Sequence, residues 1–223
     1  MCGIHLIWGK GANEEAIDTM LEKSRHRGPD QQASFSPWPG LWIGVNRLKI
    51  LHTGLEADQP LWAPDGRSLL IWNGELYNYQ VLRKQLQGLG ITFITQSDTE
   101  VVLHFLRVFG EKGLEKLQGM FAFIFVDLIE KAVLVARDQN GEKPLFYAQS
   151  PDTLLLSSEC QSIQSLKNTS LDPRQFETYY YLRAPLLGST FYKGIHEWKP
   201  GRYTKILNHS TFRWDTISIN TKL

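Results

Sequence analysis

A cysteine occupies the second position of the chain, directly after the initiating methionine. Removal of Met1 would leave Cys2 with a thiol and an α-amine on one residue. A thiol attacks as the thiolate and needs a base nearby, and an α-amine, whose pKa in model compounds is about 7.7–8.0, can be that base at neutral pH. Cys2 could therefore be both nucleophile and general base. The alternative is a small apolar side chain at the start of a buried strand, the commoner role of a free cysteine.

The pair Asn73-Gly74 follows the apolar segment 69–72 and is the second candidate for chemistry. A side-chain amide beside an unhindered backbone N–H is a suitable pair of donors for a developing oxyanion. On this interpretation the strand stops at Asn73-Gly74. The alternative is a plain type I′ turn, in which Asn-Gly is the favoured pair.

Two charged residues could hold the ends of a zwitterion. Arg47 ends a predicted strand, and its guanidinium has a fixed fork of donors that suits a carboxylate. Asp98 begins a predicted helix and could hold an ammonium group. The alternatives are an ordinary surface arginine and an acidic residue that favours the helix dipole. The charged segment 25–30 (RHRGPD) is typical of a helix end that runs into a turn.

Composition excludes several classes of function. Net charge is +1 and no Lys/Arg run is interleaved with aromatic residues, which argues against nucleic acid as a partner. No apolar stretch approaches the roughly 20 residues that span a bilayer, and the first residues do not resemble a signal peptide. Two cysteines provide neither a disulfide framework nor a zinc cluster. We expect one large or two small domains in a reducing, cytoplasmic setting.

Short apolar runs alternate with turn residues and predict a mixed fold. Expected strands are 3–8, 41–46, 69–72, 120–126, 132–136, 145–147 and 154–157. Expected helices begin after Asn13, near Val81, after Ser97 and at Pro173. Because strands come in adjacent pairs without regular βαβ alternation, we expect an α+β fold with two mainly antiparallel sheets between helix layers.

The motifs occur together and in a specific order. They are an initiator-adjacent CGI, then RHRGPD, RLKI, NGELYN, QSDTE, GMFAF, ARDQNGEKPLFY, SSE and PGRY. This order resembles the class II glutamine amidotransferase domain of the glutamine-hydrolysing asparagine synthetase family. The resemblance covers about residues 2–205, and we expect residues 206–223 to be a tail or the stub of a linker to a synthetase domain.

The resemblance implies a fold and a role for each matching residue. The fold would be the four-layer αββα sandwich of the N-terminal-nucleophile hydrolases. Cys2 would be the nucleophile and its α-amine the base, while Asn73 and Gly74 would form the oxyanion hole. The glutamine pocket would consist of Arg47 on the α-carboxylate, Asp98 on the α-ammonium, Glu75, and the backbone of Leu48, Lys49, Ile50 and Leu51. Lys49 stands where the family often has serine.

The implied reaction is the glutaminase half of an asparagine synthetase. L-Glutamine would form a thioester with Cys2 and release ammonia, and water would then release glutamate. This half needs no metal or cofactor. The sequence has no SGG-x-DS loop, so ATP and magnesium would belong to a separate synthetase domain or subunit that receives the ammonia for asparagine biosynthesis. Self-association into a homo-oligomer is a further possibility.

Two alternatives remain open from the sequence. One is a glutamine-binding relic or regulatory module without turnover. The other is the amidotransferase domain of a β-lactam synthetase-like ligase, although such domains can lose the nucleophile and this chain retains Cys2.

Overall fold

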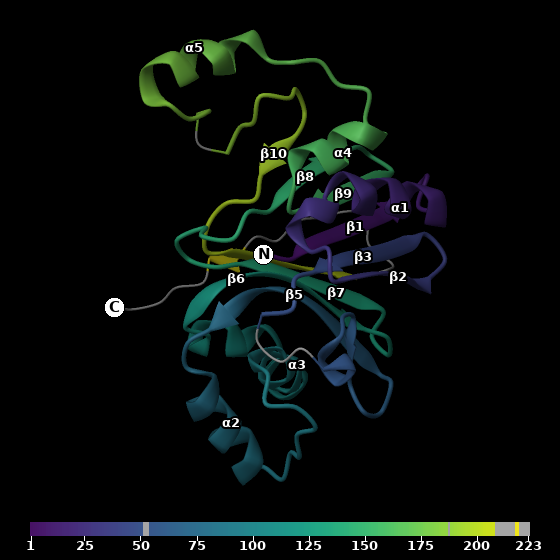
Figure 1. Ribbon diagram of the computed structural model, residues 1–223, viewed down its shortest axis with the longest axis vertical. Coiled ribbons are helices and arrows are strands. Elements are labelled where there is room, and N and C mark those ends of the chain that lie inside the picture. Colours follow the sequence, from purple (N-terminus) through teal and green to yellow (C-terminus); the bar gives the residue numbers. More distant parts are fainter. Residues whose placement is uncertain (51–53, 187, 208–216, 219–223) are drawn as a thin grey trace.

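The computed structural model describes residues 1–50, 54–186, 188–207 and, for the backbone alone, 217–218. Two six-stranded sheets lie face to face (Figure 1). The first sheet has the order β10 (His196–Glu197), β8 (Phe146–Gln149), β9 (Thr153–Ser157), β1 (Gly3–Gly9), β3 (Leu41–Arg47), β2 (Gln31–Trp38). The second has the order β12 (Ile217–Ser218), β11 (Arg202–Leu207), β7 (Ala132–Arg137), β6 (Gly119–Asp127), β5 (Ser68–Leu76), β4 (Leu61–Trp62). The pairings within both sheets are antiparallel.

Helices cover the outer face of each sheet (Figure 1). Helices α1 (Glu14–Lys23) and α4 (Cys160–Leu166) pack on the first sheet, and α2 (Tyr79–Gly88) and α3 (Asp98–Phe109) pack on the second. Helix α5 (Pro173–Leu182) stands apart from this body, beyond α4. Short 3₁₀ turns, η1 (Arg25–Arg27), η2 (Leu55–Ala57) and η3 (Gly110–Lys116), join the larger elements. The predicted four-layer αββα sandwich is confirmed.

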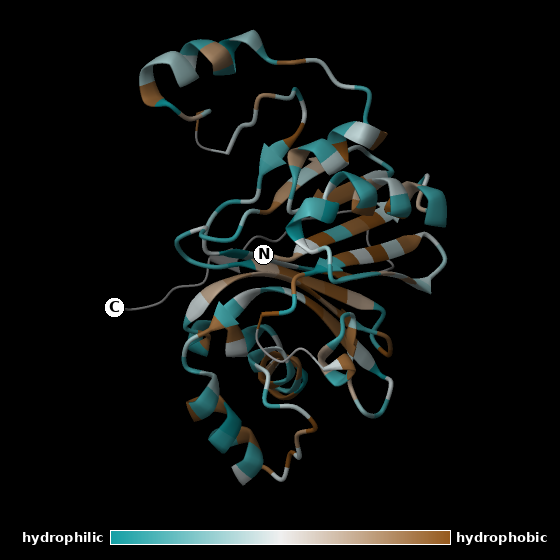
Figure 2. Ribbon diagram, viewed as in Figure 1, coloured by the Kyte–Doolittle hydropathy of each residue, from teal (hydrophilic) through white to brown (hydrophobic). Residues whose placement is uncertain are grey.

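Alternating side chains explain why the strands are apolar on both faces. In β6 the phenylalanines at 121, 123 and 125 face the α2–α3 side, while Ala122, Ile124 and Val126 face the other sheet. The interior between the sheets is completed by Ile4, Leu6, Ile43, Val45, Leu69, Ile71, Val133 and Val135. Figure 2 shows this as hydrophobic strands between helices with alternating hydrophilic and hydrophobic positions. The expectation that β6 is buried on both faces is confirmed.

The predicted helix starts are also confirmed. Asn13 accepts a hydrogen bond from the backbone N–H of Ala16, and Ser97 accepts one from Glu100. The Glu100 carboxylate does not return to the Ser97 N–H as a full capping box would; it accepts from the backbone N–H groups of Ile94 and Thr95 instead. Glu100 therefore fixes the loop before α3 rather than its first turn.

The expectation that a strand stops at Asn73-Gly74 is wrong. Strand β5 continues to Leu76, paired with β6 as far as Leu76↔Gly119. A type I′ turn needs positive φ at both central residues, and neither Asn73 nor Gly74 has it. The neighbouring strand β6 supplies a ladder along the whole segment, so tertiary pairing overrides the local turn preference.

The regular elements without a clear sequence signal are β2, β4, β10, β11, β12 and α4. Strand β2 is half-buried at the sheet edge, where Pro37 is tolerated at an irregular register. Strand β11 runs to Leu207 and so crosses the boundary expected at residue 205. Whether residues 206–223 form a linker stub stays a prediction, since most of them lie outside the described residues.

Candidate active site

Three inward-facing stripes of side chains end in polar residues at one end of the sandwich. In β1 the even-numbered residues face the interior between the sheets, and in β3 and β5 the odd-numbered residues do so. By the same alternation Cys2 extends the stripe of β1, Arg47 that of β3 and Asn73 that of β5. The register Gly3↔Asn46, continued by one residue, places Cys2 beside Arg47. The strand geometry therefore brings together residues that are far apart in the sequence.

These residues line one pocket of about 570 Å³, part of which is open to solvent. Its lining is Met1, Cys2, Arg47, Leu48, Ile50, Gln59, Trp72, Asn73, Gly74, Glu75, Asp98, Thr99 and Lys143. All but two of the residues expected to act on the substrate are in this set. The two exceptions are Lys49, whose side chain pairs with Asp58, and Leu51, which lies outside the described residues.

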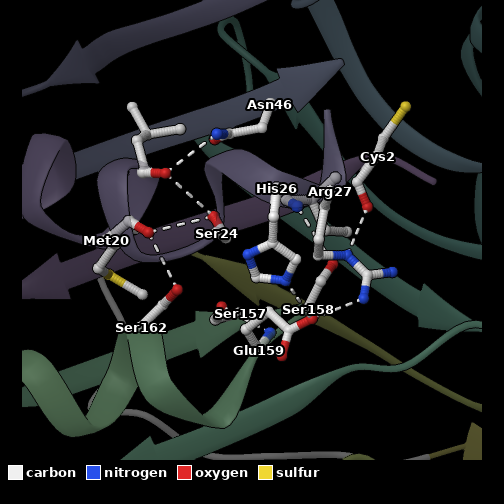
Figure 3. Close-up of polar contacts among 12 residues, drawn as sticks. Cys2, Met20, Ser24, His26, Arg27, Asn46, Ser157, Ser158, Glu159 and Ser162 are labelled. Atoms are coloured by element: carbon white, nitrogen blue, oxygen red, sulfur yellow. Dashed lines mark hydrogen bonds and ion pairs between the residues drawn. The ribbon is translucent and has the colours of Figure 1, made fainter. Parts of the chain in front are cut away.

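The backbone of Cys2 is held by an arginine from the charged segment 25–30. Arg27 donates from Nε to the carbonyl oxygen of Cys2 at 3.0 Å and from a terminal nitrogen to Glu159 at 2.7 Å (Figure 3). The Cys2 sulfur points away from this cluster (Figure 3) and lies 4.0 Å from the carbonyl oxygen of Leu48. Glu159 thus holds Arg27, which in turn holds the backbone of Cys2.

The N-terminal amine in this structure belongs to Met1. Burial lowers the pKa of that amine, and the charges of Arg27 and Lys143 lower it further, against the opposing charges of Cys2 and Asp30. With Met1 present the nitrogen of Cys2 is a peptide nitrogen and cannot be a base. Removal of Met1 would place the amine one residue deeper in the same surroundings, where the cations favour its neutral, proton-accepting form.

His5 does not offer a competing base to Cys2. His5 is fully buried, and burial together with the charge of Arg27 lowers its pKa to about 3. Its Nε2 lies 2.7 Å from the Ser24 hydroxyl at the end of α1. These contacts indicate a structural role for His5.

Asn73 presents a buried donor to the pocket. The side chain is 1% exposed, and its Nδ2 has no acceptor among the described residues. Glycine is favoured at position 74 because the backbone there lies against β6. A Cβ on residue 74 would lie 2.5 Å from the Met120 carbonyl oxygen. An unsatisfied buried amide costs stability, and it gains an acceptor when an oxyanion forms in front of it.

Asp98 is a buried carboxylate that also lines the pocket. It is 8% exposed and accepts from the backbone N–H of Leu76 at 2.8 Å, which joins the start of α3 to the end of β5. Burial raises the pKa of Asp98, and the charge of Glu75 adds to that rise, while hydrogen bonds from Leu76 and Thr99 oppose it. A cation bound beside Asp98 would relieve the desolvation of its charged form.

Arg47 is paired with a carboxylate. Its side chain is 6% exposed and lies 2.5 Å from a carboxylate oxygen of Asp58, and the same oxygen lies 2.8 Å from the Lys49 ammonium. A guanidinium held in this way is fixed in orientation before any ligand arrives.

Five residues that line the pocket were not among the expected site residues: Met1, Trp72, Thr99, Gln59 and Lys143. Gln59 forms a pair of hydrogen bonds with the backbone of Trp72, one donated and one accepted, and so supports β5 just before Asn73. Lys143 is 7% exposed and reaches the pocket from the segment 138–143, which follows β7. That segment is fixed by Asp138, which accepts from the N–H of Phe121 and of Lys143 itself. No local pattern marks Gln59 or Lys143, because only the fold brings them to Cys2.

Comparison with protein families decides what kind of domain this is. A model described as a glutamine amidotransferase domain matches residues 1–214. The chain belongs to this family. One similar protein is asparagine synthetase [glutamine-hydrolyzing] 1 of Bacillus subtilis, 34% identical over 208 residues, which are 90% of this chain and 33% of that protein. Another is asparagine synthetase [glutamine-hydrolyzing] 2 of Arabidopsis thaliana, 33% identical over 74% of this chain and 30% of that protein. The chain thus spans about a third of these relatives.

Solved structures show the same fold. Glutamine phosphoribosylpyrophosphate amidotransferase from B. subtilis matches with a TM-score of 0.70 at 22% identity, over 100% of this chain and 50% of that chain. A structure described as the allosteric regulatory enzyme of purine biosynthesis matches with a TM-score of 0.72, also at 22% identity and the same coverages. Within the described residues, no helix of this glutamine amidotransferase domain is long and apolar enough to cross a membrane. In the same part of the chain, no three His, Cys, Asp or Glu residues are grouped to hold a metal ion.

Proposed function

We propose that the chain hydrolyses L-glutamine to glutamate and ammonia through Cys2. After Met1 is removed, the α-amine takes the thiol proton and the thiolate attacks the side-chain amide carbon of glutamine. The oxyanion accepts hydrogen bonds from the Asn73 amide and the Gly74 N–H, and the amine returns the proton to the leaving nitrogen. Ammonia leaves, and water then attacks the γ-glutamyl thioester, which releases glutamate and restores the thiol.

The observation that carries this proposal is the Asn73 amide. A buried donor without an acceptor, in the pocket that Cys2 lines, is a cost to the fold that a tetrahedral oxyanion would offset. Ordinary core packing does not require an amide at that position.

The charges around the pocket favour glutamine as the substrate. Glutamine and asparagine differ by one methylene, which a pocket distinguishes by only about 1–3 kcal/mol. Selection for a free amino acid with the correct side-chain length therefore needs both ends of the zwitterion fixed. The pocket is lined by Arg47, Asp98 and Glu75. In this proposal Arg47 holds the α-carboxylate, and Asp98 with Glu75 holds the α-ammonium.

We also propose a recipient for the ammonia. The similar proteins are glutamine-hydrolysing asparagine synthetases and are about three times the length of the matching segment. A synthetase domain or subunit is therefore the proposed partner, with asparagine biosynthesis as the role and with ATP and magnesium bound there rather than in this pocket. The proposed location is the cytoplasm, whose reducing conditions keep a thiol nucleophile free.

The experiment is ammonia release from purified protein whose intact mass has been measured. L-Glutamine should be hydrolysed, D-glutamine and L-asparagine should not, and Cys2→Ala should eliminate release while the thermal unfolding temperature stays close to wild type. Cys160→Ala is the matched control, because burial raises the pKa of that thiol to about 12 and it does not line the pocket. Ammonia release that survives Cys2→Ala contradicts the mechanism. Light scattering on the same sample tests the predicted self-association.

A further inference from the structure

Next to the pocket, which Arg47 lines, the side chains of Arg47, Asp58 and Lys49 form a charged group that we call the rim. An Asp58 oxygen lies 2.5 Å from Arg47 and 2.8 Å from the Lys49 ammonium. The three side chains are all partly or largely buried, with exposures of 6% for Arg47, 17% for Lys49 and 25% for Asp58. In this environment screening by solvent is weaker than on an open surface, so their charges influence one another strongly.

This arrangement poses a problem for the proposed substrate. Arg47 is the proposed partner of the glutamine α-carboxylate, yet it already faces the carboxylate of Asp58. A neutral Arg47–Asp58 pair would attract a second carboxylate weakly, and the two carboxylates would repel each other. With Lys49 included, the formal charge of the three side chains is +1, from two cations and one anion.

Lys49 is held so that it can reach Asp58 in a fixed direction. Its backbone N–H donates to an Asp30 carboxylate oxygen at 2.8 Å, so the charged segment 25–30 anchors the chain at this position. The side-chain ammonium of the same residue lies 2.8 Å from Asp58. Lys49 is therefore part of the rim through its charge and not only through its backbone.

We propose that Lys49 is a positioning residue that retains Asp58 when glutamine binds, so that Arg47 is available to the substrate α-carboxylate. This inference rests on the proposed function and deepens it. Asp58 orients Arg47 in the empty pocket, and on binding its negative charge stays with Lys49. Lys49 and Asp58 therefore act as one pair in the selection of ligands with an α-carboxylate.

The test is a double-mutant cycle of Lys49→Ser and Asp58→Asn. In glutamine hydrolysis, K49S should raise KM about tenfold while kcat stays within about twofold, because the charge at the rim affects binding rather than the reacting amide. In the D58N background, K49S should raise KM much less than it does in the wild-type background. K49R keeps the positive charge at this position, so its KM should be close to the wild-type value. With L-glutamine α-methyl ester, which lacks the carboxylate charge, K49S should have little effect.

A matched control is Lys205→Ser, which removes a lysine from a comparable ion pair with Glu130, at 2.7 Å, outside the pocket. It should leave KM unchanged. The inference is overturned if K49S raises KM equally in both backgrounds, or if it leaves KM unaltered.

Calorimetric titration of L-glutamine into the Cys2→Ala protein, with and without the rim substitutions, separates this inference from the proposed function. Absence of both binding and turnover contradicts the proposed function itself. Binding without coupling between positions 49 and 58 contradicts only the role of Lys49. Coupling observed in binding supports that role even in a protein with slow turnover.

Discussion

Packing of the fold alone does not explain the side chains of Asn73 and Asp98 in the pocket. Asn73 has a buried amide nitrogen without an acceptor in the described residues, and Asp98 is a buried carboxylate whose pKa is raised by that burial. Each of these buried polar groups by itself lowers the stability of the fold. A ligand offsets that cost when it supplies an acceptor to Asn73 or a cation to Asp98. Residues of this kind are expected at sites where binding or catalysis has been selected over stability.

Asn73→Leu separates the proposed catalytic effect of the amide from its effect on stability. The leucine has a similar volume but no donor, so kcat should fall by about 10²–10³, as removal of an oxyanion donor does in other hydrolases. The free energy of unfolding should change by no more than about 1 kcal/mol, because Nδ2 loses no described hydrogen bond. Steady-state kinetics and denaturant unfolding measure the two effects. A fall in stability of several kcal/mol with unchanged kcat would make Asn73 structural.

Asp98→Asn should weaken glutamine binding without weakening the fold. An asparagine oxygen can still accept from Leu76, but the charge for the α-ammonium is lost. KM should rise at least about 30-fold, the equivalent of roughly 2 kcal/mol for one partner of a buried charge pair. The thermal unfolding temperature of the empty protein should be equal to or above that of wild type. A large drop in unfolding temperature would show that the carboxylate is needed for folding.

The raised pKa of Asp98 also predicts a pH dependence. Between the unfolded-state pKa and the higher folded-state pKa, the native protein binds more protons than the unfolded chain. The contribution of Asp98 to stability therefore decreases as pH rises through that interval and is constant above it. Glutamine binding should follow the opposite trend, because only the charged carboxylate holds an ammonium. Unfolding and calorimetric titrations of wild type and D98N across this pH range should show both trends in wild type alone.

Among the elements, the ends of strands position the chemistry. The apolar runs that form β1, β3, β5, β6, β7 and β9 could be recognised in the sequence, since each has a continuous buried pattern. Strand β2 could not, because its polar, half-buried residues resemble a loop until β3 pairs with them. For the same reason Asn73-Gly74 resembled a turn: the hydrogen bonds that keep it in a strand come from β6, about 50 residues later in the chain.

Gly74→Ala tests the packing of β5 on β6. The added Cβ would lie 2.5 Å from the Met120 carbonyl oxygen and 2.7 Å from the Phe121 Cβ, so the strands must separate locally. We expect a loss of about 1–3 kcal/mol in unfolding free energy together with a lower kcat, since the displaced N–H belongs to the proposed oxyanion hole. Gly88→Ala, at an exposed position with nothing within 4 Å of the added Cβ and without positive φ, is the matched control. Equal losses in the two variants would contradict close packing as the cause.

In the whole molecule, the site is made by the stacking of two sheets. Cys2 and Arg47 come from one sheet and Asn73 and Gly74 from the other, while the N-terminus of α3 adds Asp98. The sequence could indicate these residues because their motifs match a known family in order. It could not indicate Gln59, Lys143 or the Asp58 contact, because those depend on distances across the fold that no local period encodes.

The central claim is that Cys2, once it is the first residue, carries the glutamyl group. The most direct measurement is the mass of the N-terminal peptide after the purified protein is mixed with L-glutamine and quenched in acid. The account predicts a peptide that begins at Cys2, without Met1, and a quenched fraction that carries a γ-glutamyl adduct on that residue. A peptide that retains Met1 in a protein that still releases ammonia, or an adduct on any other residue, would contradict it.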